Sequence, residues 1–227
     1  MSGIMWYLAG LITLLAFADI TRSFINPETN NFQVLGVFFV VVLAISTMKS
    51  DKVLYTVEIL LVFSVPFILF LLGKSFFNKY LSYDSILIVA SHVTEPVGWT
   101  TISAATYTYT GYINMLIFNK YITKKPKLLW VVALLGVGNL CTSFFIPIGF
   151  LGADGSTDFP FPWVATADSM RMELAFVERV LYVFLLLYAI LAYTSMFIHW
   201  HVGIEMFKGA FYRPNPSKLR NRIIAGA

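Results

Sequence analysis

The side chains best suited to binding a ligand are hydroxyls and phenols gathered near the end of the segment 92–112. They belong to Thr106, Thr108, Thr110, Tyr107, Tyr109 and Tyr112. Such groups both donate and accept hydrogen bonds, which suits a small polar molecule. Residues 106–111 are also poor helix formers, because threonine and tyrosine lose side-chain freedom in a helix and glycine costs about 1 kcal/mol. We therefore predict an unwound stretch that carries a substrate-binding site. The residues expected to form the site are Thr108, Tyr109, Thr110, Gly111 and Tyr112.

A second interpretation of this segment stays open. Backbone freed from helical pairing at membrane depth is tolerated where it is buried in protein or lines a wet cavity, and discontinuous helices form binding sites in many transporters. However, small residues and threonines also mediate ordinary helix packing in lipid. An unwound ligand site and an intact packing helix are therefore both compatible with these residues.

Several charged side chains lie inside apolar stretches, where a charge costs about 2.5–3.5 kcal/mol. Glu178 and Arg179 are adjacent, hence about 100° apart on a helix. We expect them to attach the outer loop to the start of the helix that follows, with gating as a second possible role. Glu58 is either an ion or proton site or an interfacial carboxylate paired with Lys52 or Lys49, and the sequence favours the pair.

The histidines are poor candidates for a metal centre. His92 and Glu95 have helical spacing, but two ligands are fewer than a zinc site needs. His199 and His201 differ by two positions, so they point to nearly opposite sides of a helix, and each could at most ligate a haem. With Trp200 between them, anchoring at the membrane interface is the favoured interpretation. We expect no metal and no cofactor, and without a catalytic triad or phosphate-binding glycine loop we expect no enzyme.

The composition identifies the class of protein that positions these residues. The chain has 227 residues, of which 58% are hydrophobic and 12% charged, about half the charged share of a soluble domain. This excludes a disordered chain and a nucleic-acid-binding protein. The single cysteine, Cys141, excludes a disulfide within the chain. The sequence therefore indicates a membrane protein that crosses the bilayer several times.

We predict an all-α membrane protein with six spans, because a span needs about 20 mostly apolar residues. The expected spans are about 4–24, 32–47, 53–73, 85–118 (interrupted), 128–150 and 174–204. They form one domain, residues 1–206, and residues 207–227 form a basic cytoplasmic tail. A turn-forming outer loop begins near Leu151, and residues 164–172 are expected to form a short surface helix before the sixth span.

The loop charges orient these spans. With six crossings, most of the lysines and arginines fall on the side that holds both termini, the 48–52 turn and the 119–127 loop. The other side receives only Arg22, Lys74, Lys79 and Arg171, apart from Arg179 at the start of a span. Basic loops stay in the cytoplasm, so we expect both termini to be cytoplasmic.

Six short segments, read in order, also carry a family resemblance. They are residues 18–22 (Ala-Asp-Ile-Thr-Arg), 26–29 (Asn-Pro-Glu-Thr), 108–112 (Thr-Tyr-Thr-Gly-Tyr), 119–127 (Asn-Lys-Tyr-Ile-Thr-Lys-Lys-Pro-Lys), 161–163 (Phe-Pro-Trp) and 176–179 (Phe-Val-Glu-Arg). Their order and spacing resemble the B subunit of spore germinant receptors, in the amino acid–polyamine–organocation permease superfamily. The chain departs from that pattern at Ile113, where relatives often carry glutamate.

The resemblance implies a ten-helix inverted-repeat permease fold, of which this chain would supply the third to eighth helices and lack two at each end. It also implies A and C partner subunits and a place in the spore inner membrane. The leading hypothesis is a subunit that binds and senses a germinant, with an amino acid as the expected ligand. An amino acid permease is the alternative of the same fold. A haem- or metal-bearing helical subunit, or a purely architectural one, is the alternative of another class.

Overall fold

The computed structural model describes residues 2–24, 30–122, 129–174 and 177–211, with backbone alone at 31, 34, 107–109, 171–174 and 177–179. The α-helices are α1 (Ser2–Phe24), α2 (Asn31–Ser46), α3 (Ser50–Phe76), α4 (Tyr83–Ala90), α5 (Trp99–Thr106), α6 (Met115–Phe118), α7 (Leu129–Asp158), α8 (Pro162–Ser169) and α9 (Val180–Phe211). The 3-10 helices are η1 (Ser91–Thr94), η2 (Tyr107–Asn114) and η3 (Asn119–Tyr121). Two short strands, β1 (Arg171–Leu174) and β2 (Val177–Arg179), pair antiparallel.

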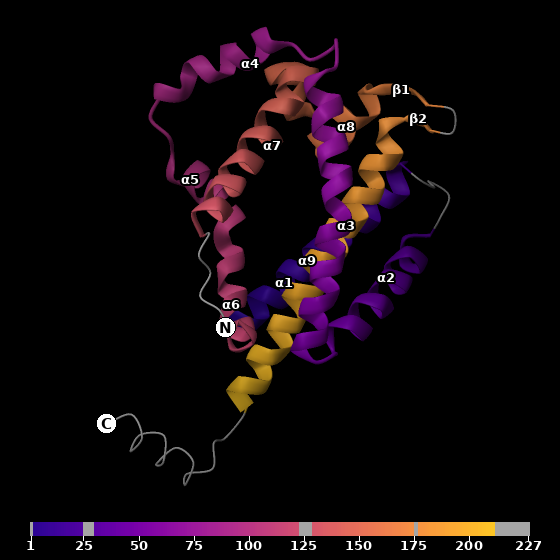
Figure 1. The fold of residues 1–227 in the computed structure, drawn as a ribbon, viewed down its shortest axis with the longest axis vertical. Helices are drawn as coiled ribbons and strands as arrows, with labels where there is room; N and C mark the ends of the chain where they lie inside the picture. The colour runs from indigo at the N-terminus through magenta and orange to yellow at the C-terminus, as the bar shows by residue number, and fades with distance from the viewer. Residues whose placement is uncertain (1, 25–29, 123–128, 175–176, 212–227) are drawn as a thin grey trace. The chain divides into compact units, whose positions relative to one another are not determined.

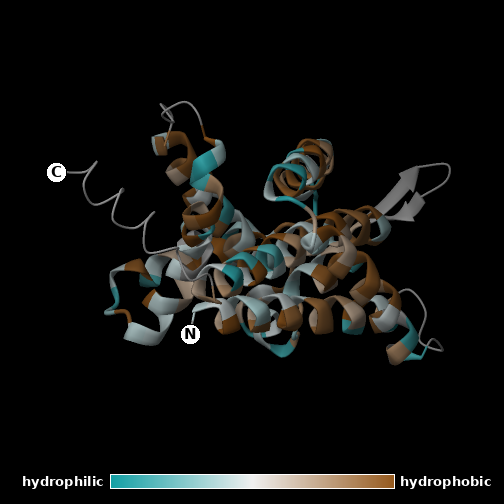
Figure 2. Ribbon diagram, turned by 90° about the horizontal axis from the view of Figure 1, so that it is seen from below, coloured by the Kyte–Doolittle hydropathy of each residue, from teal (hydrophilic) through white to brown (hydrophobic). Residues whose placement is uncertain are grey.

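Four helices in the described ranges are long and apolar enough to cross a membrane: α1, α3, α7 and α9, of 23, 27, 30 and 32 residues. Figure 2 shows hydrophobic residues along much of the helical ribbon. The expected second span corresponds to α2, which has only 16 residues and is about 24 Å long at 1.5 Å per residue. The predominantly helical architecture is confirmed, with one short β-hairpin that we did not expect.

The chain divides into two compact units, of which the first comprises residues 1–53 and 195–227. Within it, α1 and the C-terminal part of α9 pack closely at Gly10 and Trp200. The Trp200 indole is fully buried, donates to the Tyr7 carbonyl at 3.2 Å and stacks on the Tyr7 ring at 5.1 Å. A Cβ on Gly10 would lie 2.3 Å from two atoms of that indole. Glycine is therefore required there for the two helices to approach.

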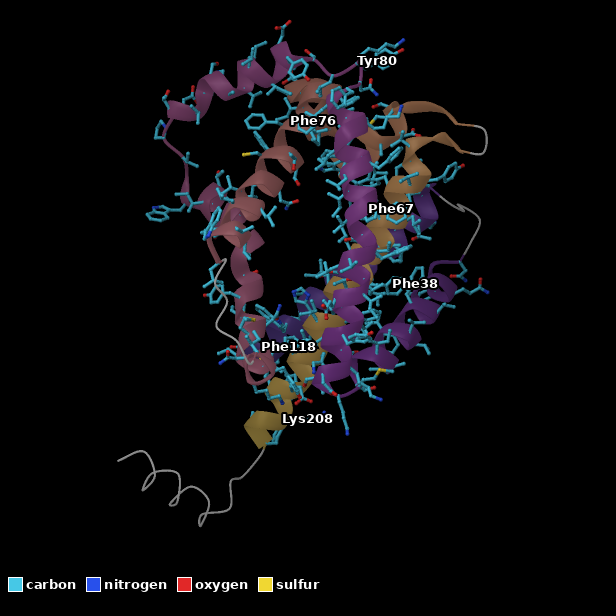
Figure 3. The ribbon with its side chains drawn as sticks, in the orientation of Figure 1. Phe38, Phe67, Phe76, Tyr80, Phe118 and Lys208 are labelled. Carbon is cyan, nitrogen blue, oxygen red and sulfur yellow. The ribbon has the colours of Figure 1, made fainter. Side chains whose placement is uncertain are left out.

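The same unit includes α2, which packs beside α1. The helix begins after Asn30, whose side-chain oxygen accepts the Phe32 N–H at 3.0 Å and so provides an N-cap. Phe38, labelled in Figure 3, contacts Phe17 of α1 with ring centroids 4.7 Å apart. Phe39 meets the Trp200 ring edge-on at 5.3 Å. Aromatic contacts thus join the three helices of this unit around one buried indole.

The second unit comprises residues 54–194 and is organised around α7, which α4 and α8 flank (Figure 1). The α7 helix is interrupted at Gly152, whose φ of 80° is a left-handed conformation that favours glycine. Close to this interruption the Ser82 N–H donates to the Gly149 carbonyl at 2.8 Å. The Ser82 hydroxyl also accepts the Ser85 N–H at 3.2 Å and caps α4. One residue therefore begins α4 and attaches it to α7.

The region between α7 and α9 differs from our expectation in two ways. The short helix we expected at the surface is α8, and Val164, Thr166, Ala167 and Met170 at or just after it are almost completely buried. Because residues Arg171–Leu174 and Val177–Arg179 form strands, α9 starts at Val180 and not near Leu174. At its other end α9 continues to Phe211, into the expected tail, whose residues 212–227 lie outside the described residues.

Candidate functional site

The expected fourth span is a chain of short helices from Tyr83 to Tyr121. Between η1 and α5 the chain leaves helical geometry at residues 95–98, and Glu95 is extended with ψ of 144°. The cause is Pro96, because proline disfavours the helical conformation in the residue before it. After this break α5 begins at Trp99, with the Thr101 and Ile102 N–H groups donating to the Gly98 carbonyl. The main interruption therefore lies before the stretch that we expected to be unwound.

The predicted binding residues lie in η2, which keeps 3-10 pairing instead of unwinding. The side chains of Thr108 and Tyr109 lie outside the described residues. Thr110 is partly buried, whereas Gly111 is exposed and the Tyr112 side chain is 72% exposed. A Cβ on Gly111 would meet only the Asn114 amide nitrogen, at 3.9 Å. This stretch is therefore an open, tightly wound surface, and mid-helix 3-10 segments often mark functional hinges.

A groove of about 350 Å³ adjoins this 3-10 stretch. Its lining residues are Val97, Thr101, Ile102, Ala105, Thr106 and Leu140. They come from the Pro96 break, from α5 and from α7, and Thr106 directly precedes η2. The surface that these residues expose to the groove is apolar, and apolar lining with a few polar groups nearby is typical of small-ligand sites. The break, α5 and α7 thus line one groove, which we call the α5–α7 groove and which ends at the residue before η2.

The helix that supplies Leu140 to this groove contains a proline about two turns further on. Pro147 has no N–H, so the Ser143 carbonyl four residues earlier loses its helical donor. The Trp163 indole N–H of α8 donates to that carbonyl at 3.1 Å. Lipid cannot satisfy a free carbonyl, so a protein donor here replaces the missing helical bond.

The charged candidates lie apart from the α5–α7 groove lining. His92 and Glu95 approach to 3.9 Å, and both side chains are exposed. Glu58 is exposed on α3. Glu178 and Arg179 are in β2, not in a helix, and their side chains lie outside the described residues. Among the residues that the structure describes, no group of three His, Cys, Asp or Glu side chains could hold a metal ion.

His199 and His201 are both engaged by protein groups within the first unit. The His199 Nδ1 atom lies 2.6 Å from the Ser195 carbonyl. His201 is 1% exposed, and its Nδ1 atom lies 2.8 Å from the Ser46 carbonyl while its Nε2 atom lies 2.9 Å from the Ser50 hydroxyl. A carbonyl only accepts, so Nδ1 donates to Ser46, and in the neutral imidazole Nε2 then accepts from the Ser50 hydroxyl. His201 therefore connects α9 to the end of α2 and the start of α3.

Two features of this region were missed in the sequence. The Pro96–Gly98 break was visible as a proline and a glycine close together inside an apolar segment, a combination that marks turns. The contact between Trp163 and Ser143 had a partial signal, because Pro147 inside a helix predicts a free carbonyl at Ser143. Nothing in the sequence indicates that the donor is twenty residues away.

One family model, described as spore germination protein (spore permease), matches residues 4–220 of the chain. The match covers the helices described above except for the first two residues of α1, and it includes the broken segment and the α5–α7 groove. Comparison with curated proteins gives no match, and comparison with solved structures gives none either. The chain is therefore a multi-pass membrane protein that belongs to the spore germination protein family.

Proposed function

We propose that the chain binds a germinant, an amino acid, and senses it as the B-type subunit of a spore germination receptor. One observation supports this most directly: in a chain matched to the family over residues 4–220, a broken helix and a groove of about 350 Å³ lie together. The partners would be A- and C-type subunits in the spore inner membrane. The protein would act by binding and changing conformation, without enzymatic chemistry.

The proposed architecture goes further than the four long helices. With α2 and the broken segment as additional spans, the chain would cross the membrane six times and keep both termini in the cytoplasm, as the loop charges favour. These spans would correspond to the third to eighth helices of a ten-helix inverted-repeat fold. In folds of that kind the binding site lies near the bilayer midplane, against interrupted helices.

The α5–α7 groove suits the two ends of an amino acid. Its apolar lining, from Ile102, Ala105 and Leu140, would receive an aliphatic side chain. The charged ends would bind beside the groove, at the backbone of residues 95–98, because the groove surface itself is apolar and the Thr106 hydroxyl already donates to the Ser103 carbonyl. The proposed site continues along η2 to Gly111 and Tyr112, which were predicted from the sequence and lie outside the groove lining itself. A ligand shifts a conformational equilibrium only by its differential affinity for the two states. If η2 acts as a hinge beside the site, a ligand that prefers one state of the hinge would change the conformation of the other helices.

Replacing Gly111 with leucine should abolish ligand binding without unfolding the protein. The leucine side chain would cover the surface of η2, and the open space around Gly111 accommodates it. The measurement is the thermal unfolding midpoint of the detergent-purified chain against a panel of amino acids, nucleosides and sugars. A ligand at 100 times its dissociation constant stabilises the folded state by about 2.7 kcal/mol, so one amino acid should raise the midpoint of the wild-type chain by several degrees.

The matched control is Gly111→Ala, whose Cβ meets nothing closer than 3.9 Å and which should keep the ligand-induced shift. Equal shifts in all three proteins would place the ligand elsewhere. A panel without any shift, in a sample that shows a haem absorbance band, would support the cofactor-bearing alternative. The absence of both a midpoint shift and a haem band would support an architectural subunit. The engaged nitrogens of His201 argue against a haem ligand at that position.

An amino acid permease is the second candidate, and the family's description as a spore permease favours it. The same groove would then be exposed alternately to the two sides of the membrane. Transport and sensing can be distinguished by measuring the flux of the amino acid across a membrane. Uptake of the stabilising amino acid into proteoliposomes, lost in Gly111→Leu and kept in Gly111→Ala, would support transport, whereas binding without uptake would support sensing.

A further inference from the structure

Helix α3 carries one charged residue inside its apolar part. The helix is among those long and apolar enough to cross a membrane, and Glu58 is the only charged residue from Val53 to Gly73. It lies five residues after the start of this apolar run, about 7.5 Å at 1.5 Å per residue. A charged side chain is costly at such a depth, and in membrane proteins it pairs with another group or faces a wet cavity. Glu58 therefore requires a compensating group.

The described part of the chain does not supply that group. Among the residues that the structure describes, none forms a hydrogen bond or an ion pair with the Glu58 side chain, which is exposed. The pair that we expected with Lys52 or Lys49 is therefore not formed. Lys52 precedes Glu58 by six positions, which places it about 120° away around the helix. A glutamate stem is also about half as long as that of lysine, whose length lets its charge reach the membrane interface.

Glu58 belongs to a stripe of exposed side chains along α3. Its members follow one another at intervals of three and four residues: Tyr55, Glu58, Val62, Val65 and Leu69. Tyr55, Val62 and Leu69 are 65–66% exposed, and Val65 is 49% exposed. Side chains at these alternating intervals lie on one face of a helix and form the seam by which two helices pack in left-handed bundles. We call these five residues the α3 seam.

We propose that the α3 seam is the docking surface for a transmembrane helix of another protein, which carries a lysine or arginine opposite Glu58. Lipid tails are as apolar as Val62 and Leu69, so the apolar members alone would not require a partner. The carboxylate does, because lipid tails offer it neither a positive charge nor a hydrogen-bond donor. A second copy of this chain would bring another carboxylate through the same surface, whereas a cationic helix compensates the charge.

The position of Glu58 within the α3 seam would also define how the two helices align. A single polar position in an otherwise apolar seam specifies the register of packed helices, since any other alignment leaves the charge facing apolar side chains. The docking does not depend on the identity of the ligand, or on whether the α5–α7 groove binds one.

The test measures binding between the full chain and synthetic single-span helices in vesicles of phosphatidylcholine, a lipid without net charge. The probes are helices of leucine and alanine that carry lysine, glutamine or glutamate at the depth of Glu58. Energy transfer from the chain's five tryptophans to a dansyl group on the probe reports binding. We expect the lysine probe to bind about tenfold more tightly than the glutamine probe, a difference of about 1.4 kcal/mol. Glu58→Gln should remove this preference, and Glu58→Lys should transfer it to the glutamate probe.

The matched control moves the carboxylate sideways at almost the same depth. Combining Glu58→Gln with Ile59→Glu turns it about 100° around α3, off the α3 seam and onto a position that is also exposed. This double variant should bind the lysine and glutamine probes equally. Leu69→Ala should weaken the binding of every probe, because it removes apolar contact from the α3 seam and leaves the charge unchanged.

The proposal is overturned if the wild-type chain binds the lysine and glutamine probes equally, as it would with a protonated Glu58 or one neutralised by the chain's own lysines. It is also overturned if the double variant keeps the preference for lysine, or if no probe binds the wild-type chain. Should Glu58→Gln fail to fold, the comparison of the two probes on the wild-type chain decides alone.

Discussion

A large loss of stability is expected from Gly10→Leu, which should lower the free energy of unfolding by about 3 kcal/mol, the upper end of the usual cost of overpacking. A Cβ at this position would lie 2.3 Å from both Cδ1 and Nε1 of Trp200. The indole cannot easily move aside, because it is fully buried, hydrogen-bonded to the Tyr7 carbonyl and packed against the rings of Tyr7 and Phe39. Helix α1 and the end of α9 would have to separate.

The measurement is the thermal unfolding midpoint together with the yield of monodisperse protein in detergent. Gly36→Leu is the control, since nothing lies within 4 Å of a Cβ there and the substitution places leucine in α2 of the same unit. Gly10→Ala should already lower the midpoint, because the clash involves the Cβ itself. Trp200→Ala should restore part of the loss when combined with Gly10→Leu. A stable Gly10→Leu protein with an unchanged midpoint would show that α1 and α9 do not pack closely at this point.

The second large effect is expected from His201→Leu, which should lower the free energy of unfolding by about 2–4 kcal/mol. The substitution leaves the Ser46 carbonyl without the Nδ1 donor and the Ser50 hydroxyl without the Nε2 acceptor. Both serines are buried, and each buried group left unsatisfied costs about 1–3 kcal/mol. The loss should appear as a midpoint about 6–12 °C lower, at roughly 3 °C per kcal/mol for a chain of this size.

His92→Leu is the control, because that imidazole is exposed and its loss should change the midpoint little. Ser50→Ala should cost about 1 kcal/mol, the usual net worth of one hydrogen bond. In the His201→Leu background Ser50→Ala should cost less, because the hydroxyl has already lost its acceptor. Additive costs would mean that His201 stabilises the helices through its volume alone.

The long helices were predictable from the sequence because their signal is local. A run of about 20 apolar residues predicts a membrane helix whatever its neighbours are, and the expected spans at 4–24, 53–73 and 128–150 correspond to α1, α3 and α7. The start of the last span was misplaced, because Arg171–Leu174 and Val177–Arg179 form a hairpin. The pairing of two short strands depends on which residues face each other, and hydropathy contains no such information.

The weak helix at the predicted binding stretch was foreseeable from the sequence, but the groove beside it was not. Threonine, tyrosine and glycine at 106–112 indicated weak helix, and the backbone there is 3-10. The larger interruption depends on Pro96, whose effect on Glu95 is local and could have been predicted. The groove could not have been predicted, because one of its lining residues, Leu140, comes from another helix, α7. The burial of α8 was equally hidden, since Val164, Thr166 and Ala167 are small side chains without a long apolar run.

The short length of α2 has a consequence for the surrounding lipid. At 16 residues the helix is about 24 Å long, whereas the hydrocarbon core of a typical bilayer is about 30 Å thick. If α2 crosses the membrane as proposed, the hydrocarbon layer beside it must be thinner by about 6 Å, or lipid headgroups must move inward to its ends. The annulus around this helix would then be thinner than the membrane around α3 or α9. A membrane whose thickness or fluidity changes would act on α2 first, so the energetics of the protein would depend on the physical state of its bilayer.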